Sequence, residues 1–306
     1  MNTTHLKYII EVEKTGSISK AAENLYMSQP QLSKAIRELE ESVGISIFKR
    51  SSKGVVPTTK GVEFIMDAKG IIAQLQRLET TYNPKKSEML TLDAVVARCE
   101  YISEAFSKFL SHISNDKKEK IIFRETNTTR SIKNVATGEN NIGIIKYNVA
   151  YEQYFFQMLD ERELKHEILW EYDEVIAVSK NSPLAKLSVV TEADLQDMTE
   201  ILFGDNIIHY GRSARSMKDA RENDNMHHIL VYERAGMCSA LIGDENSYSR
   251  ITPSPEGYYD ENKIRIIPMK SQDSKYRDVL FYRKDYKLTD TDKLFVEILK
   301  EVISEL

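Results

Sequence analysis

The sequence predicts an α/β protein whose amino-terminal part is small and mainly helical. The chain has 306 residues, more than one domain usually contains. Apolar residues recur at helical spacing over most of residues 1–82, and from residue 89 onward strand-like apolar runs alternate with helical segments. Hydrophobic residues are 41% and charged residues 29% of the chain, which is the composition of a folded protein.

Charge is distributed unevenly along the chain. Residues 1–60 contain 9 Lys and Arg against 6 Asp and Glu, so their net charge is +3 while the rest of the chain carries −8. A basic nucleic-acid-binding module joined to an acidic body would show this asymmetry, although a difference of this size also arises by chance. The asymmetry therefore needs support from motifs.

Several classes of protein are disfavoured by what the sequence lacks. Residues 1–17 contain no signal-peptide pattern, and no segment approaches the ~18 apolar residues that span a membrane. Cys99 and Cys238 are far apart and the histidines lack ligand spacing, which argues against a disulfide framework and a metal site. We expect a cytoplasmic protein without a metal or cofactor.

The first two predicted helices are short and close together. Leu6 and Ile9 follow a helical period, and the chain breaks at Gly16. Ser17 is placed to cap the next helix by accepting a hydrogen bond from a free backbone amide. That helix contains two small alanines within residues 20–25, which allow close helix packing.

Residues 29–39 predict a third helix with a polar side. Leu32, Ile36 and Leu39 are spaced to face inward. The remaining surface carries amide, hydroxyl and cationic side chains, namely Gln29, Gln31, Ser33, Lys34 and Arg37. Such a helix after a tight turn fits the major groove of DNA, where amides and hydroxyls bind base edges and cations bind phosphates. An ordinary solvated helix face is the alternative.

Two short strands around a cationic turn are predicted next, at residues 44–50 and 54–58, which completes a winged helix-turn-helix. This ordered set, spread over about sixty residues, resembles the signature of LysR-type transcriptional regulators. The residues that carry the resemblance are Gly16, Ser17, Ala21, Ala22, Leu25, Ser28, Gln29, Pro30, Leu32, Ser33, Ile36, Leu39, Glu40, Gly44, Phe48, Lys49, Arg50, Pro57, Thr58 and Gly61.

The resemblance implies a regulator that binds double-stranded promoter DNA. It places Gln29, Pro30 and Ser33 near base edges, with Gln31 on the same polar helix. The residues that it places nearer the phosphates are Ser28, Lys34, Arg37, Arg50, Ser52 and Lys53. Thr58 either contacts the DNA backbone or caps the following helix.

Residues 59–82 predict a long helix with an apolar stripe, which consists of Val62, Ile65, Ala68, Ile72, Leu75 and Tyr82. The spacing is typical of a short coiled-coil seam, and in the family this linker helix packs on its twin, so a homodimer or homotetramer is implied. A helix packed on its own chain is the alternative. We expect a DNA-binding domain at 1–60 and a dimerisation helix with a hinge at 61–88.

The remaining residues, 89–306, predict a separate α/β domain. They resemble, more loosely, the effector-binding domain of the same family, in which two subdomains of a periplasmic-binding-protein-like fold enclose a small molecule. Subdomain I is expected at about 89–162 and 269–306, and subdomain II at about 163–268. Closure on the effector would change angles within the oligomer, and RNA polymerase is left open as a further partner.

Effector contacts in such a domain come from loops that follow strands. These loops and the opposite wall suggest an acidic or polyhydroxylated effector, whose identity the sequence does not reveal. The alternative is helix capping by the threonines and a surface ion pair for the arginine. The predicted contact residues are Arg98, Cys99, Thr126, Asn127, Thr128, Gly204 and Gly236.

Other functions have less support in the sequence. There is no GxSxG, GxGxxG or P-loop motif, so we expect no enzyme. An architectural DNA-binding protein with a degenerate, non-sensing effector domain is one alternative. A redox-sensing regulator that uses Cys99 and Cys238 is another, although scattered cysteines are more often small buried hydrophobic residues.

Overall fold

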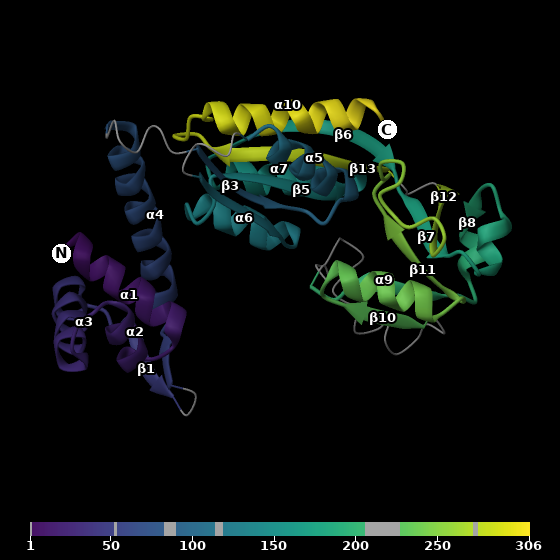
Figure 1. The fold of residues 1–306 in the computed structure, drawn as a ribbon. Coiled ribbons are helices and arrows are strands. Elements are labelled where there is room, and N and C mark those ends of the chain that lie inside the picture. The colour runs from purple at the N-terminus through teal and green to yellow at the C-terminus, as the bar shows by residue number, and fades with distance from the viewer. Residues whose placement is uncertain (1, 52–53, 83–89, 114–118, 206–226, 272–274) are drawn as a thin grey trace. The chain divides into compact units, whose positions relative to one another are not determined.

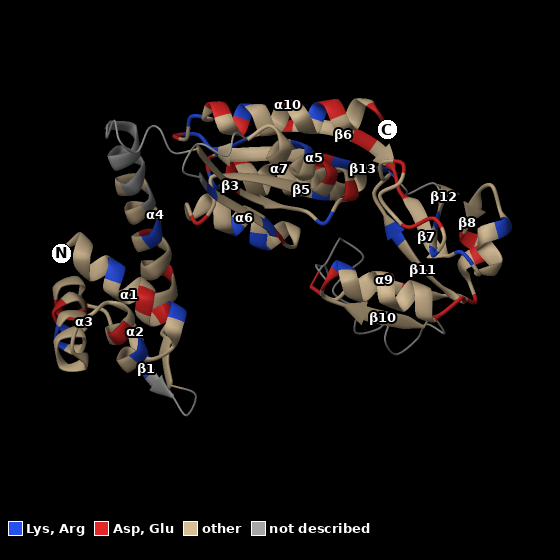
Figure 2. Cartoon of the chain, viewed as in Figure 1, with Lys and Arg blue, Asp and Glu red and all other residues tan. Residues whose placement is uncertain are grey.

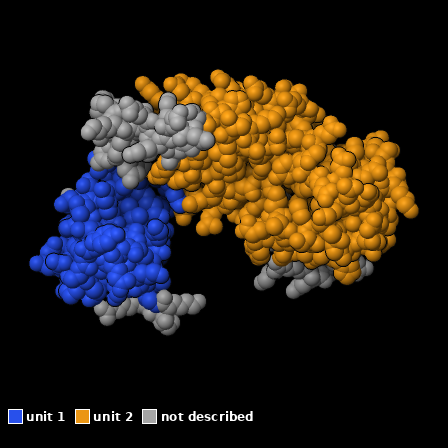
Figure 3. Space-filling view, in the orientation of Figure 1, with its two compact units in different colours: residues 1–89, 136–139 blue, residues 90–135, 140–306 orange. Residues whose placement is uncertain are grey.

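The computed structural model describes all residues except 1, 52–53, 83–89, 114–118, 206–226 and 272–274. It divides into two compact units, coloured separately in Figure 3, of residues 1–89 with 136–139 and residues 90–135 with 140–306. The first unit is mainly helical and the second contains two mixed sheets, which confirms the predicted fold class (Figure 1).

The first unit consists of α1 (Thr3–Thr15), α2 (Ile18–Asn24), α3 (Gln29–Val43), β1 (Phe48–Ser51), β2 (Gly54–Pro57) and α4 (Thr59–Tyr82). The strands β1 and β2 pair antiparallel as a hairpin. The Ser17 hydroxyl accepts a hydrogen bond from the Lys20 amide, so the predicted cap is confirmed. Gly16 and Gly44 end α1 and α3 in the left-handed conformation, which glycine adopts without strain.

One core holds the first unit together. Leu32, Ile36 and Leu39 of α3 are buried in it, as their spacing predicts. The start of α4 passes so close to the chain before β1 that a Cβ on Gly61 would lie 1.9 Å from the carbonyl oxygen of Ile47. Only glycine allows this approach, which fixes the hairpin against the long helix.

The second unit begins with a five-stranded sheet in the order β4-β3-β5-β13-β6. Its strands are β3 (Leu90–Val96), β4 (Glu119–Glu125), β5 (Ile142–Asn148), β6 (Leu164–Asp173) and β13 (Lys275–Arg283). β3 pairs parallel with β4 and β5, and β13 pairs antiparallel with β5 and β6. The associated helices are α5 (Glu100–Ser111), α6 (Thr128–Ala136), η1 (Val149–Tyr151), α7 (Glu152–Asp160) and α10 (Asp290–Ser304), of which α5 and α10 share one core with the central strands.

A six-stranded sheet in the order β10-β9-β11-β7-β12-β8 follows. It contains β7 (Val175–Ser179), β8 (Val190–Thr191), β9 (Thr199–Phe203), β10 (His228–Val231), β11 (Ser247–Ile251) and β12 (Ile264–Lys270). Parallel pairs join β9 to β10 and β11, and β8 to β12, while β7 is antiparallel to β11 and β12. Its helices are η2 (Pro183–Lys186), η3 (Glu192–Leu195) and α9 (Arg234–Gly243).

The chain passes between the two sheets twice, from β6 to β7 and back from β12 to β13 (Figure 1). The first passage lies at Glu174, later than the expected boundary near residue 163. The reason is that β6 pairs along its length with β13 and so belongs to the first sheet. We call the first sheet with its helices subdomain I and the second subdomain II.

None of the described helices has the length and apolar character needed to cross a membrane.

Candidate nucleic-acid interface and ligand site

The start of α3 presents polar side chains to solvent. Gln29, Pro30, Gln31, Lys34 and Arg37 are exposed, and Ser33 is half-buried. Because the apolar side of the same helix lies in the core, these side chains are held on the outside of the unit. The helix thus has the two-sided character that binding in a DNA groove requires.

Hydrogen bonds order the first turn of this helix. Gln31 Oε1 accepts from the backbone amide of Ser28 at 3.1 Å and from its hydroxyl at 2.9 Å, which fixes the start of α3. Gln29 Nε2 donates to Ser33 Oγ at 2.8 Å. The amide oxygen of Gln31 is therefore used within the protein, whereas Gln29 and Ser33 form an exposed polar pair.

The hairpin is tied to α3 by one carboxylate that the sequence interpretation did not assign. Glu40 Oε1 accepts hydrogen bonds from the amides of Ile47 at 2.6 Å and Phe48 at 3.0 Å. It therefore joins the end of α3 to the start of β1. Glu40 is one of the residues that carry the family resemblance, and this is the sequence feature by which its importance could have been recognised.

The hairpin and the residue after it contain four of the predicted DNA-contact residues, namely Arg50, Ser52, Lys53 and Thr58. β1 contains Arg50, whose side chain lies outside the description, as do Ser52 and Lys53 entirely. Thr58 Oγ1 donates to the Ser46 carbonyl at 2.6 Å and accepts from the Gly61 amide at 2.9 Å. Thr58 therefore caps α4, which was the alternative to a contact with the DNA backbone.

Both signs of charge occur on the ribbon of the first unit, α3 included (Figure 2). Lys34 lies 3.7 Å from Glu38 on the next turn of α3, and both side chains are largely exposed. Such a pair contributes little to stability. The case for a nucleic-acid interface therefore rests on the ordered start of α3 and the hairpin and not on a uniformly basic surface.

The apolar stripe of α4 is used within the chain over much of its length. Ile65, Ala68 and Ile72 are buried in the same core as α1 and α3, which is the arrangement that the sequence left as the alternative. Leu75 is half-buried, and the side chain of Tyr82 lies outside the description. Among the described side chains of this helix, Val62 is 44% exposed and Ile71 is 40% exposed.

The predicted effector residue Arg98 already has an anionic partner. Its Nη1 and Nη2 donate to Oδ1 and Oδ2 of Asp205, both at 2.8 Å, and the arginine side chain is 8% exposed. Its guanidinium lies over the ring of Phe203, 4.8 Å from the ring centre. Arg98 follows β3 in subdomain I, and Asp205 follows β9 in subdomain II, so this contact spans the two subdomains.

The predicted polar loop at 126–128 is hydrogen-bonded into subdomain I. The Thr126 amide donates to the Val96 carbonyl at 2.9 Å, and Thr128 Oγ1 donates to the Lys146 carbonyl at 3.0 Å. Asn127 Oδ1 accepts from the Arg130 amide at 2.9 Å, as a helix cap does. Both threonines are buried.

Of the predicted glycines, Gly204 directly precedes Asp205, and Gly236 lies in the first turn of α9. A Cβ on Gly204 would lie 2.8 Å from the ring of Tyr232, so glycine brings the backbone close to that ring. Among the described residues of subdomain II, Asp205 and Arg234 contribute charged groups here, and the sequence patterns assigned neither of them. Each of these two residues contacts a partner more than a hundred residues away in the sequence, and local patterns do not reveal such a contact.

Cys99 is fully buried. Its Sγ lies 3.5 Å from Asp278 Oδ2 and accepts a hydrogen bond from Thr252 Oγ1 at 3.3 Å. Burial raises the pKa of the Cys99 thiol and, to a smaller extent, that of the half-buried Cys238. Reactive cysteines have lowered pKa values, so both thiols have the environment of structural cysteines.

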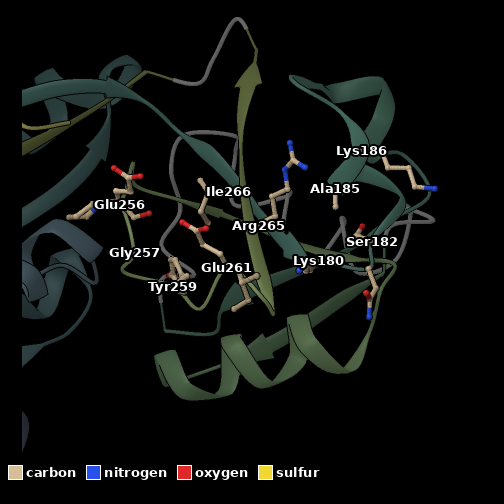
Figure 4. A pocket seen from close by; sticks show the side chains of 14 residues that line it. Lys180, Ser182, Ala185, Lys186, Glu256, Gly257, Tyr259, Glu261, Arg265 and Ile266 are labelled. Atoms are coloured by element: carbon tan, nitrogen blue, oxygen red, sulfur yellow. The ribbon is translucent and has the colours of Figure 1, made fainter.

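A separate groove of about 960 Å³ lies in subdomain II. It is formed by the end of β7, by η2, by the loop before β12 and by β12 itself, and it contains no predicted effector residue (Figure 4). Lys180, Lys186 and Arg265 line it together with Glu256 and Glu261. Its charged side chains are of both signs and exposed.

Comparison with known proteins agrees with the geometry of the first unit. Residues 3–62 match the family model described as "Bacterial regulatory helix-turn-helix protein, lysR family". The chain is 29% identical over 257 residues to the HTH-type transcriptional regulator AlsR of Bacillus subtilis, covering 82% of this chain and 76% of AlsR. It is 27% identical over 248 residues to the Hca operon transcriptional activator HcaR of Escherichia coli, covering 79% of each.

Solved structures share the fold of the whole chain. Full-length CbnR in complex with its target DNA has a TM-score of 0.63 at 16% identity, covering 99% of this chain and 100% of that one. A full-length OxyR variant from Pseudomonas aeruginosa has a TM-score of 0.63 at 17% identity, covering 99% and 97%. At such identities the likeness establishes the fold.

Replacing Glu40 tests its role in joining α3 to the hairpin. Glu40→Ala should lower the free energy of unfolding by about 1–3 kcal/mol, because two backbone amides lose their acceptor. Urea unfolding followed by circular dichroism measures this. The matched control is Glu41→Ala, an exposed neighbour that should stay within ~0.5 kcal/mol of the wild type. Equal unfolding midpoints for the two variants would contradict the assigned role.

Proposed function

We propose that this chain, a LysR-type transcriptional regulator by its amino-terminal domain and its relatives, binds promoter DNA sequence-specifically as a homo-oligomer and responds to a small-molecule effector. The observation that carries the proposal is the exposed start of α3. Gln29 and Ser33 are hydrogen-bonded to each other there, on a helix whose other side is anchored in the core. The domain division at 1–60, 61–88 and 89–306 is part of the proposal.

We assign base contacts to Gln29, Pro30 and Ser33, because amide and hydroxyl groups at the start of a recognition helix reach base edges. Gln31 instead positions the helix through its bonds to Ser28. Thr58 supports the interface by capping α4. The phosphate contacts are assigned to Ser28, Lys34, Arg37, Arg50, Ser52 and Lys53.

The oligomer contact is assigned to the part of α4 that its own core does not use. Ile71 is exposed, and it shares one helical face with Leu75 and Tyr82 at spacings of four and seven residues. Ile65, Ala68 and Ile72 are left out, because they are buried in the same chain. A two-fold contact on α4 would present two α3 helices to the two half-sites of an operator.

The effector is assigned to the boundary between subdomains I and II, where Arg98 and Asp205 meet. A ligand that binds there changes the contacts between the two subdomains. It thereby shifts the equilibrium between different arrangements of the subdomains. In this proposal the protein is cytoplasmic and not catalytic, and RNA polymerase at the bound promoter is its downstream partner.

Removing the hairpin arginine tests the phosphate contacts. Arg50→Ala should weaken binding to all DNA sequences and reduce the slope of log K against log salt by about 1, because one phosphate contact is lost. Fluorescence anisotropy with operator and random duplexes at several salt concentrations measures both quantities. Lys165→Ala, an exposed cation of the second unit, is the control and should change neither. An unchanged slope for Arg50→Ala would remove the hairpin from the interface.

A charge on α4 tests the oligomer contact. Ile71→Asp should convert the dimer or tetramer to smaller species, because it introduces a carboxylate in the proposed apolar seam. Sedimentation velocity reports the change in mass. The control is Tyr154→Asp, which makes the same kind of substitution at a 53% exposed aromatic residue on α7. If Ile71→Asp kept the wild-type mass, the seam would lie elsewhere.

A further inference from the structure

The contact between Arg98 and Asp205 has the geometry of a bound carboxylate ligand. Two parallel N–H···O hydrogen bonds of 2.8 Å join the guanidinium to both oxygens of the carboxylate. A free carboxylate ion binds an arginine in the same two-pronged way. The arginine side chain is 8% exposed and rests on the ring of Phe203, so water competes little for this pair.

The neighbouring arginine at the subdomain boundary is neutralised in the same manner. Arg234 of α9 donates to Glu125 Oε1 and, at 2.9 Å, to the hydroxyl of Tyr258, and it lies 3.6 Å from Glu100 Oε1. Glu125 and Glu100 belong to subdomain I, whereas Arg234 belongs to subdomain II. Arg98 and Arg234 therefore each pair with a carboxylate from the opposite subdomain.

The two pairs differ in how strongly they are held. Arg234 contacts two carboxylates and a tyrosine hydroxyl, and Tyr259 donates a further hydrogen bond of 2.7 Å to Glu100. Asp205 forms an ion pair with Arg98, and the Asp205 side chain is 26% exposed. Exchange of the Asp205 carboxylate for another anion is thus the smaller disturbance, since it replaces one partly exposed charge by an equal one.

We propose that Asp205 is a built-in competitor for the effector, which carries a carboxylate and binds Arg98 by replacing that of Asp205. The inference rests on the proposed function and narrows it to one ligand class and one regulating residue. The apolar part of the ligand would lie beside Phe203, against which the guanidinium is stacked. Asp205 occupies Arg98 in most of the molecules. The apparent affinity for the effector is therefore the intrinsic affinity multiplied by the fraction of molecules in which Arg98 is free.

The exchange also explains how binding is sensed. Asp205 belongs to subdomain II and Arg98 to subdomain I, so a ligand that takes the arginine breaks a link between the subdomains. The link through Arg234 is left in place. The effector therefore changes the contacts at this boundary without having to separate the subdomains completely.

The test is a titration of full-length protein with cyclohexanecarboxylate, a probe with a carboxylate and an apolar ring, and with its neutral amide. Isothermal titration calorimetry is carried out on the wild type, Asp205→Asn, and the double variant Asp205→Asn with Arg98→Gln. Asp205→Asn should bind the carboxylate about tenfold more tightly than the wild type does, because the competing charge is gone. The amide should show no gain, and the double variant should lose the gain for the carboxylate.

The control is Asp260→Asn, which removes an exposed carboxylate of subdomain II that pairs with Lys263. It should bind both probes like the wild type. Thermal melting verifies that each variant is folded. The proposal is overturned if folded Asp205→Asn gains no affinity for the carboxylate, or gains equally for the amide. DNA binding by the same variants is measured separately, so a failure of the regulator assignment is distinguishable from a failure of this one.

Discussion

The buried carboxylate of Asp278 holds together the part of subdomain I from which the chain passes to subdomain II. Asp278 on β13 accepts hydrogen bonds from the hydroxyls of Tyr101 at 2.7 Å and Tyr172 at 2.8 Å. Tyr172 lies on β6, two residues before the passage at Glu174, and Tyr101 lies on α5. Burial raises the pKa of Asp278, and loss of a partner would leave a buried polar group unpaired. The position of Arg98 depends on this arrangement, because the chain runs from Arg98 directly into α5.

The residues proposed to bind DNA and those proposed to bind the effector belong to different compact units, each with its own core. One side of α4 is buried in the core of the first unit. A second copy of the chain can therefore contact only the apolar residues of α4 that this core leaves exposed. In this account the effector alters the spacing of two intact DNA-binding units and leaves the structure of each unchanged.

Local patterns in the sequence predicted what depends on neighbours along the chain. The inward side of α3, the cap at Ser17 and the alternation of strands and helices are such features, and the structure confirms them. The passage between the subdomains was placed too early, because the pairing of β6 with β13 joins segments about a hundred residues apart. For the same reason the sequence suggested Arg98 as a ligand contact but did not reveal its partner Asp205. The sequence suggested an acidic or polyhydroxylated effector but did not distinguish these two classes, because the partners of the suggested contact residues were unknown.

The central claim is sequence-specific DNA binding by α3 and the hairpin. Footprinting of the purified protein on the DNA upstream of its own coding region, with and without a mixture of metabolites, tests it most directly. The account predicts protection of two related half-sites about one helical turn apart or a multiple of it, with boundaries that shift when the metabolites are present. Absence of any sequence-selective protection at moderate salt would contradict it.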